Sequence, residues 1–371
     1  MAARSAGGRG ALFAGVMSGT SLDGADAALV DFSAAAPRTL AFATVAFGSE
    51  LRRTLFALSS PGGDGLDLAG AACFELSQIY ARAVVEAIAA AGKAPAEVAA
   101  IGCHGQTVRH RPERGFTIQL NDPARVAELT GIDVVADFRS RDIAAGGQGA
   151  PLAPAFHEAV FREPGRSRAV INIGGISNIT WLPADGPTTG FDCGPGNVLL
   201  DGWIQKHQGV ACDLDGRWAA SGSSNAALLE RLLRDPFFER HPPKSTGREL
   251  FGMGWLQDKV VSELPPADVQ ATLTEFTAHA VVSGLDRFCP GTDELFLAGG
   301  GARNAFLVSR IRALARSRMV ALTDQLGVPT GQVEAVAFAW LAMKCVRREA
   351  IDLSAVTGAR GPRVLGGLYP A

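Results

Sequence analysis

Short apolar runs separated by polar turns open the chain and predict strands. These runs end in Gly, Ser, Thr or Asp, and strands are expected at 10–17, 25–32, 40–47, 98–103, 116–120 and 132–136. Apolar positions recur at helical spacing between them, and helices are expected at 50–58, 68–91 and 123–130. Asn121 or Asp122 is the expected cap of the last of these helices. Such alternation predicts a layered α/β domain whose later strands are parallel.

The same pattern restarts near Phe138. Strands are expected at 168–173, 177–182, 188–192, 294–298 and 319–322. Helices are expected at 195–207, with Pro195 in the first turn, and at 268–288, 303–315 and 332–348. A less regular polar insert runs over 209–255. The repetition predicts two domains, 1–138 and 139–371, that face each other across a central cleft.

Length, charge and cysteine use narrow the class of protein. The chain has 371 residues, more than one ordinary core holds, which favours two domains. Its net charge of −2 provides no basic field for nucleic acid or an anionic membrane, and no apolar stretch reaches the ~20 residues of a membrane span. The six cysteines form no Cys-x-x-Cys pair and no zinc-type spacing with histidine. We therefore expect a reduced, cytoplasmic protein that binds neither nucleic acid nor a membrane.

A Gly-rich turn between the first two strands is the first candidate site. It reads Gly19, Thr20, Ser21, Leu22, Asp23, Gly24, Ala25, Asp26. Glycines allow a ligand close to the backbone, and hydroxyl and N–H groups can bind phosphate oxygens. The Asp23 carboxylate could hold Mg²⁺ through water. An ordinary hairpin turn accounts for the same residues, so the turn alone does not decide between these readings.

Two further Gly-rich turns lie in the second half. Gly174, Gly175 and Asn178 belong to a turn placed like the first one, and two such turns facing one cleft could grip a nucleoside triphosphate. Gly299, Gly300 and Gly301 follow a strand and open a helix, which is the geometry of a phosphate cradle. The acidic residue of a dinucleotide fingerprint is missing downstream, so a dehydrogenase is a poor match. Turns of this kind also serve simply for packing.

Acidic residues near strand and helix ends are candidates for catalysis. Asp192 is expected at the carboxyl end of a strand, followed by a rigid Gly-Pro-Gly, where a carboxylate can act as a general base. A capping role explains Asp192 as well. Glu334 lies early in the last helix, where the helix dipole already favours an acid.

Polar residues also follow two strands of the first half, where open α/β sheets bind ligands. They are His104, Gln106 and Thr107 after one strand, and Asp137, Arg139 and Asp142 after the next. Amides, an arginine and acids suit a polyhydroxylated or carboxylated substrate. A lone histidine such as His104 also suits a structural role.

Together these segments resemble the anhydro-N-acetylmuramic acid kinase family of the actin/hexokinase-like sugar kinases. The resemblance runs from about Gly15 to Gly367. It rests on the order of several motifs: G-V-M-S-G-T-S-L-D-G-A-D, C-H-G-Q-T, A-D-F-R, G-G-Q-G-A-P-L-A-P-A-F-H, I-N-I-G-G-I-S-N, F-D-C-G-P-G-N, S-T-G-R-E-L-F and L-A-G-G-G-A-R-N. Cys193 stands where the family is expected to carry a small residue, often Thr.

The resemblance implies a fold, a reaction and roles for residues. The fold would be two duplicated ribonuclease H-like (actin/hexokinase-type) domains flanking a central cleft. The enzyme would open the 1,6-anhydro bridge of anhydro-N-acetylmuramic acid with water and phosphorylate O6 with ATP and Mg²⁺, as a homodimer that serves peptidoglycan recycling. Gly19–Asp26 would bind the ATP phosphates, Asp192 would be the base, and Glu334 would lie near the anomeric carbon. The polar cluster from His104 to Asp142 would contact the sugar.

Other activities on the same scaffold stay open at this point. A kinase for another amino sugar or a small carboxylate would use similar motifs. A sugar-sensing regulator usually adds a helix-turn-helix domain, and an ATP-driven chaperone relative adds a client-binding domain. The expected element pattern leaves no room for either addition.

Overall fold

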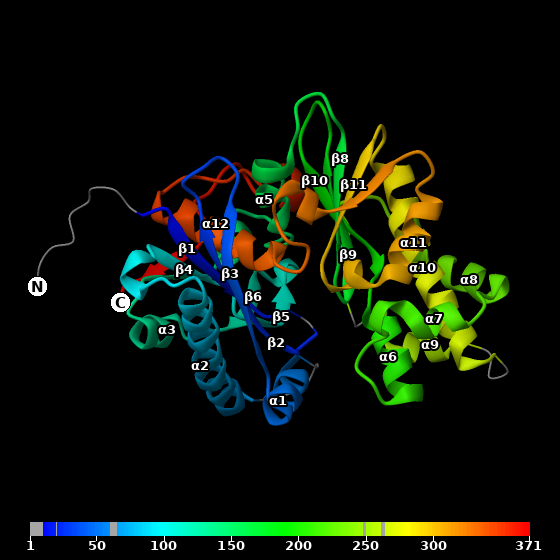
Figure 1. Cartoon of the computed structure of the whole chain (residues 1–371), viewed down its shortest axis with the longest axis horizontal. Coiled ribbons are helices and arrows are strands. Elements are labelled where there is room, and N and C mark those ends of the chain that lie inside the picture. The colour runs from blue at the N-terminus through cyan, green and yellow to red at the C-terminus, as the bar shows by residue number, and fades with distance from the viewer. Residues whose placement is uncertain (1–9, 20, 60–64, 248–249, 261–263) are drawn as a thin grey trace, which may run out of the picture. The chain divides into compact units, whose positions relative to one another are not determined.

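The computed structural model has a mixed α/β fold and describes residues 10–19, 21–59, 65–247, 250–260 and 264–371 (Figure 1). The chain forms two compact units. Unit 1 contains residues 1–156 and 332–371, and unit 2 contains residues 157–331. This division differs from the expected one at residue 138, because residues 139–156 and the last forty residues belong to the first unit.

The sheet of unit 1 has six strands in the order β13-β7-β4-β1-β2-β3. β1 pairs antiparallel with β2 and β2 with β3, whereas β1 pairs parallel with β4 and β4 with β7. The strands are β1 (Leu12–Met17), β2 (Gly24–Asp31), β3 (Arg38–Ala46), β4 (Ala100–Cys103), β7 (Val134–Ala136) and β13 (Gly367–Tyr369). A separate ribbon is formed by β5 (Gln106–Arg111) and β6 (Phe116–Leu120).

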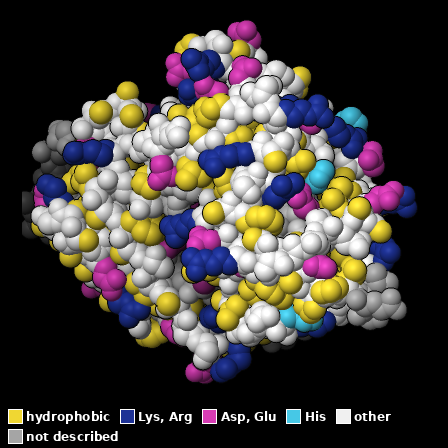
Figure 2. Space-filling view, turned by 45° about the vertical axis from the view of Figure 1, so that its right-hand side comes forward, with side chains coloured by type: hydrophobic (Ala, Val, Ile, Leu, Met, Phe, Trp, Pro, Cys, Tyr) yellow, Lys and Arg dark blue, Asp and Glu magenta, His cyan; other side chains and the backbone are white. Residues whose placement is uncertain are grey.

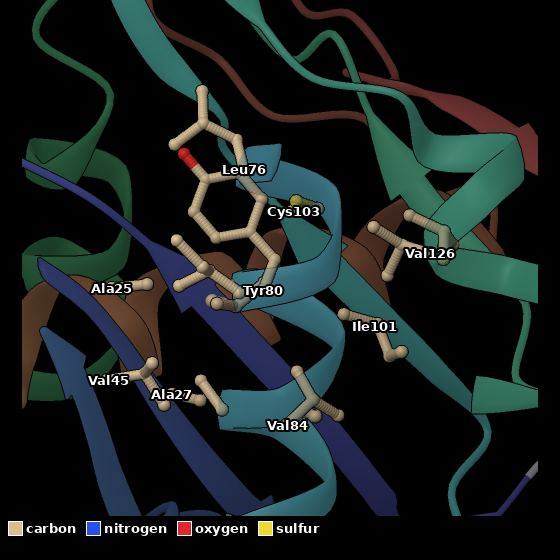
Figure 3. Packing of buried hydrophobic residues seen from close by; sticks show 14 of the residues in the cluster. Ala25, Ala27, Val45, Leu76, Tyr80, Val84, Ile101, Cys103 and Val126 are labelled. Atoms are coloured by element: carbon tan, nitrogen blue, oxygen red, sulfur yellow. The ribbon is translucent and has the colours of Figure 1, made fainter. Parts of the chain in front are cut away.

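Helices cover both faces of this sheet. On one face lie α2 (Leu66–Ala90) and α3 (Pro123–Thr130), with α1 (Ser49–Ser59) packed on α2, and on the other lies α12 (Val333–Val346). The shorter helices are α4 (Ser140–Ala144), α13 (Ser354–Thr357) and α5 (Ala153–Phe161), which runs from unit 1 into unit 2. Along β1, Ala14 and Val16 belong to the apolar core that contains Tyr80 of α2, part of which is drawn in Figure 3. Gly15, between them, faces α12, and a Cβ there would lie 1.9 Å from the Ala335 carbonyl oxygen. The alternation along β1 thus places a core on one face and a closely packed helix on the other.

Unit 2 has a five-stranded sheet in the order β10-β9-β8-β11-β12. β8, β9 and β10 pair antiparallel, and β8, β11 and β12 pair parallel. The strands are β8 (Arg168–Ile173), β9 (Ile176–Leu182), β10 (Thr189–Pro195), β11 (Glu294–Ala298) and β12 (Met319–Leu322). The helices are α6 (Val198–Gln208), α7 (Arg217–Ser221), α8 (Ala226–Leu233), α9 (Met253–Gln257), α10 (Pro266–Phe288) and α11 (Ala305–Leu314). The directions of these five strands match those of β3, β2, β1, β4 and β7 in unit 1.

Most expected elements are present, and the exceptions are informative. The bounds of β6, α3, β8, β11 and β12 match the expected ranges, and the Asp122 carboxylate caps α3 by accepting a hydrogen bond from the Arg125 N–H. Pro195 ends β10 instead of opening a helix, which begins only at Val198. In the described part of the polar insert lie α7 and α8, and α9 begins near its end; apolar residues of these helices form a small core with α6 and α10.

Three further facts concern the thiols, the surface charges and the helices. All six cysteines are free thiols. Acidic and basic side chains are interspersed on the face drawn in Figure 2, in keeping with the small net charge. Within the described residues, none of the helices is long and apolar enough to cross a membrane.

Candidate functional site

The Gly-rich turn of unit 1 joins β1 to β2. Leu22 adopts a left-handed backbone with φ of 58°, and its N–H donates to the Gly19 carbonyl at 3.3 Å. The Ser21 hydroxyl donates to the exposed Asp23 carboxylate at 2.7 Å. Gly24 has no room for a side chain, since a Cβ would lie 2.6 Å from the Val45 carbonyl oxygen. Thr20 lies outside the described residues.

Hydrogen bonds hold both ends of this turn, a buried one before it and an exposed one after it. Before it, the buried hydroxyls of Ser18 and Tyr80 lie 2.7 Å apart, and Tyr80 projects from α2 as Figure 3 shows. After it, the Thr44 hydroxyl donates to the Asp26 carboxylate at 2.6 Å. The exposed part of the turn, with its hydroxyl and carboxylate, is therefore carried on fixed ends.

His104 and Arg139 form a buried pair in the same unit. The Arg139 guanidinium donates to His104 Nε2 from Nε at 3.1 Å and from Nη2 at 2.9 Å. Burial, reinforced by the Arg139 charge, lowers the pKa of His104 well below its usual value, so the ring is neutral at pH 7. Burial also lowers the pKa of Arg139 to about 10, against the opposing effect of Glu334 and Asp142. A neutral His104 accepts at Nε2 and carries its proton on Nδ1, a buried atom without a hydrogen-bond partner in the described part of the chain.

Glu334 belongs electrostatically to this group. It lies in the first turn of α12 and keeps an exposed surface. Loss of hydration among the surrounding protein atoms raises the pKa of its carboxyl, Arg139 lowers it, and Asp26 raises it further. Within unit 1, the structure thus brings together an acid of α12, the arginine that is expected to contact the sugar, and Asp26 at the end of the Gly-rich turn.

The other residues that were expected to contact the sugar differ in burial and in the hydrogen bonds that they make within the protein. Asp137 is exposed and has a left-handed backbone, with φ of 56°. Asp142 is buried, and its two carboxylate oxygens accept hydrogen bonds from the Gly149 N–H at 2.7 Å and the Thr357 hydroxyl at 2.8 Å. Gln106 is buried and Thr107 accepts from Gln119 at 3.2 Å. Asp142 therefore positions the 146–150 loop in this structure.

The Gly-rich segments of unit 2 converge. The N–H groups of Gly196 and Asn197 donate to the carbonyls of Gly175 and Gly174 at 2.9 and 2.8 Å. A Cβ at Gly299, whose φ is 83°, would lie 2.4 Å from the Asn172 side-chain oxygen. The turns at 174–175, 194–197 and 299–301 consequently pack together at one end of β8 and β11. The close packing of these turns is by itself a reason for glycine at these positions, whether or not the turns bind a ligand.

Asp192 lies on β10, at the edge of the unit 2 sheet. Its carboxylate is half-buried and accepts a hydrogen bond from the Thr246 N–H at 2.9 Å, while its own N–H donates to the Lys244 carbonyl at 3.0 Å. A β-bulge follows directly, and Gly194 takes φ of 147°. The bulge turns the strand next to the carboxylate, which is a common device beside functional residues.

The donors available for a metal are limited. Among the described residues no group of three or more His, Cys, Asp or Glu side chains could hold an ion. An ion carried by phosphate groups and met through water by one exposed carboxylate, such as Asp23, fits this donor set.

A family model described as anhydro-N-acetylmuramic acid kinase matches residues 11–371. The chain belongs to the anhydro-N-acetylmuramic acid kinase family. Curated relatives with this name are 51% identical in Cupriavidus metallidurans, with 97% of each chain covered, and 54% identical in Bordetella petrii, with 98% of this chain and 97% of the relative covered. A third, from Nitrosospira multiformis, is 50% identical over 98% of this chain and 100% of its own.

Solved structures are more distant. An activator of 2-hydroxyisocaproyl-CoA dehydratase from Clostridium difficile with bound ADPNP is 12% identical, with a TM-score of 0.47 over 91% of this chain and 97% of that one. This likeness is too loose to add to the family assignment.

The anhydro-N-acetylmuramic acid kinase motifs account for the expected residues, but the structure adds others. Tyr80 and Ser18 hold the Gly-rich turn, and Lys244 and Thr246 hold Asp192. Lys244 directly precedes the S-T-G-R-E-L-F motif, and this motif was the sequence signal from which a role of Lys244 and Thr246 could have been predicted. Nothing in the sequence around Tyr80 distinguishes it from other core residues. Arg248 and Glu249 of that motif lie outside the described residues.

Proposed function

We propose that the chain is an ATP-dependent anhydro-N-acetylmuramic acid kinase. It opens the 1,6-anhydro bridge and phosphorylates O6, giving N-acetylmuramic acid 6-phosphate and ADP for peptidoglycan recycling. The observation that carries the proposal is the family match over residues 11–371, together with about half of all residues identical in curated relatives. The corresponding strand directions in the two sheets support a duplicated, ribonuclease H-like architecture of the actin/hexokinase type. The family resemblance further suggests a cytoplasmic homodimer.

The proposed chemistry begins at Asp192. Its carboxylate takes a proton from water as the water oxygen attacks the anomeric carbon, and the C1–O6 bond breaks. The O6 that is released attacks the γ-phosphorus of ATP, the bond to the β-phosphate oxygen breaks, and ADP leaves. Asp192 then returns its proton to solvent. Glycoside hydrolysis normally needs a second carboxyl to protonate the leaving oxygen, and here phosphoryl transfer to O6 replaces that acid.

The residues of unit 1 have binding roles in this proposal. Residues 19–26 hold the phosphates, with hydroxyl and N–H donors on a turn whose ends are fixed. Gly174, Gly175 and Asn178, and Gly299, Gly300 and Gly301, contribute nucleotide contacts from unit 2. His104, Gln106, Thr107, Asp137, Arg139 and Asp142 contact the sugar or position the loops that do. Mg²⁺ carried by the nucleotide would neutralise phosphate charge, and Asp23 is the residue that would meet it through water.

Glu334 is assigned to the anomeric end of the sugar. Its position beside Arg139 and Asp26, whose charges act on its pKa in opposite directions, supports a carboxyl whose ionisation responds to charge on a bound substrate. In this role it stabilises positive charge that develops at the anomeric carbon.

Isotope labelling tests the proposed reaction. The protein is incubated with Mg-ATP and anhydro-N-acetylmuramic acid in H₂¹⁸O and quenched early. We expect ADP and sugar 6-phosphate in equal amounts, with ¹⁸O on the C1 hydroxyl and none in the phosphate. Label in released inorganic phosphate would indicate simple ATP hydrolysis and contradict the proposal, and preferred turnover of another amino sugar would favour a kinase for that sugar.

A further inference from the structure

Residues 244–246 form a short brace along the edge strand that carries Asp192. The Lys244 carbonyl accepts the Asp192 N–H at 3.0 Å, and the Thr246 N–H donates to Asp192 Oδ2 at 2.9 Å. One segment thus fixes both the backbone of Asp192 and one carboxylate oxygen. A displacement of this segment would change where the carboxylate points.

The Lys244 side chain anchors the brace in an aromatic pocket. Its Nζ lies 4.7 Å from the ring centre of Phe237, 5.1 Å from that of Phe288 and 5.9 Å from that of Phe191. The ammonium also donates to the Phe237 carbonyl at 3.4 Å. Phe191 precedes Asp192 on β10, and Phe288 ends α10, so the cation joins three separate elements. Ring faces attract a cation most strongly where water is excluded.

The burial of this site separates Lys244 from ordinary surface lysines. Phe237 and Phe191 are buried, and Phe191 packs edge-to-face on Phe288 with ring centres 5.5 Å apart. Loss of hydration lowers the pKa of the Lys244 ammonium. The rings and the carbonyl replace part of the lost hydration, so the ammonium stays fixed instead of reaching out into solvent.

Two other lysines of the chain each lie over a single ring. Lys206 lies over Trp203 at 5.5 Å, and Lys344 lies over Trp340 at 5.3 Å. Each of these contacts joins a lysine to one ring on its own helix, which gives no reason to expect an effect on Asp192. Lys244, by contrast, joins the brace to the strand that carries Asp192.

We propose that Lys244 is a positioning residue for Asp192, because it anchors the segment whose Thr246 N–H holds the carboxylate. The inference rests on the proposed role of Asp192 as the base. The structural observations behind it do not depend on that role, however, because the brace and the aromatic pocket both lie within unit 2.

Lys244→Met tests the anchor, since it keeps the aliphatic stem and removes the charge. We expect kcat to fall at least ~10-fold, because small misplacements of catalytic groups are costly, while KM for the sugar and for ATP changes less than about twofold. Lys206→Met is the matched control and should keep both constants. Phe288→Leu removes one half-buried ring and should lower kcat by a smaller factor. This second variant tests the proposal if Lys244→Met folds poorly. Unchanged kcat in folded Lys244→Met or in folded Phe288→Leu would overturn the proposal.

A double variant shows whether Lys244 acts through Asp192. In the Asp192→Asn background, adding Lys244→Met should cause no further loss of kcat. A full additional loss would mean that Lys244 acts elsewhere, and the inference would be wrong. If Asp192→Asn alone kept normal activity, the proposed function of Asp192 would fail first, so the two failures can be told apart.

Discussion

At the scale of single residues, the proposed function depends most on the placement of one carboxylate. Asp192 is half-buried, follows the buried Phe191, and is held by a backbone N–H donor. A hydrogen bond to the ionised form keeps a carboxylate ready to accept a proton. An asparagine amide at position 192 would keep the shape of the side chain but would lack the basicity of the carboxylate.

Asp192→Asn should therefore lower kcat by ~10²–10⁴-fold, the usual contribution of a general base. Ring opening and ATP consumption should fall together, because O6 becomes a nucleophile only when the bridge opens. Kinetics with both products monitored measure this, and calorimetry should show that the sugar and ATP still bind. The control is Asp215→Asn, an exposed residue at φ of 57°, a conformation that Asn tolerates well. Normal ring opening by Asp192→Asn would refute its role as base.

The sequence identified residue types at this scale better than it identified their contacts. It predicted a polar cluster containing Asp142, but not that Thr357, 215 residues away, occupies one of its carboxylate oxygens. It indicated His104 as a candidate, but not that burial and the neighbouring Arg139 charge would lower the pKa of His104 and keep its ring neutral. Contacts between segments that are distant in the sequence depend on the completed fold, so they could not be predicted from a single sequence.

At the scale of elements, periodicity was a good guide where segments were buried. β8 and β11 are nearly continuous apolar runs in the middle of a sheet, and their bounds match the expected ranges. β5 was missed because His104 to Thr107 looked like a polar loop, and β13 because three exposed residues give no alternation to detect. Pro195 was assigned to a helix on its preference for first turns, whereas the bulge after Asp192 extends the strand through it.

The close packing of the glycine turns in unit 2 predicts different outcomes for neighbouring glycines. Gly299→Ala places a Cβ 2.4 Å from the Asn172 side-chain oxygen at a backbone φ of 83°, whereas the nearest atom to a Cβ at Gly300 would be Asn197 Nδ2, at 3.8 Å. We expect Gly299→Ala to lower the free energy of unfolding by about 2–3 kcal/mol, from backbone strain and overpacking together. Gly300→Ala should change it by less than about 1 kcal/mol. Thermal unfolding of both variants measures the difference, and equal stability would show that the turns are not tightly packed.

At the scale of the whole molecule, buried histidines link stability to pH. Burial lowers the pKa of His157 to about 3 and of His110 to about 4, and it lowers that of His104 too. In the unfolded chain each should titrate near ~6.5. Below that pH the unfolded state binds more protons than the folded state, so the stabilisation present above ~6.5 is lost as pH falls toward the folded pKa values.

The free energy of unfolding should accordingly be nearly flat above pH ~7 and decline between ~6.5 and 5. Each buried histidine contributes a slope of up to ~1.4 kcal/mol per pH unit in this range. His157→Asn keeps a group that can reach the Thr180 hydroxyl, which lies 2.9 Å from His157 Nδ1. Denaturant titrations at pH 7.5, 6.5 and 5.5 should show a shallower decline in this variant. A slope identical to that of the unaltered protein would mean that folding does not lower the pKa of His157.

Because residues 332–371 belong to the first unit, the two units are completed in a particular order during synthesis on the ribosome. Unit 2 is continuous in sequence and can be completed as soon as residue 331 emerges, whereas the sheet begun by β1 lacks α12 until later. The face of that sheet around Gly15 and Gly102, made for close helix contact, therefore stays uncovered while unit 2 is translated, roughly 10–35 s at ~5–20 residues per second. The part synthesised first is thus the part finished last.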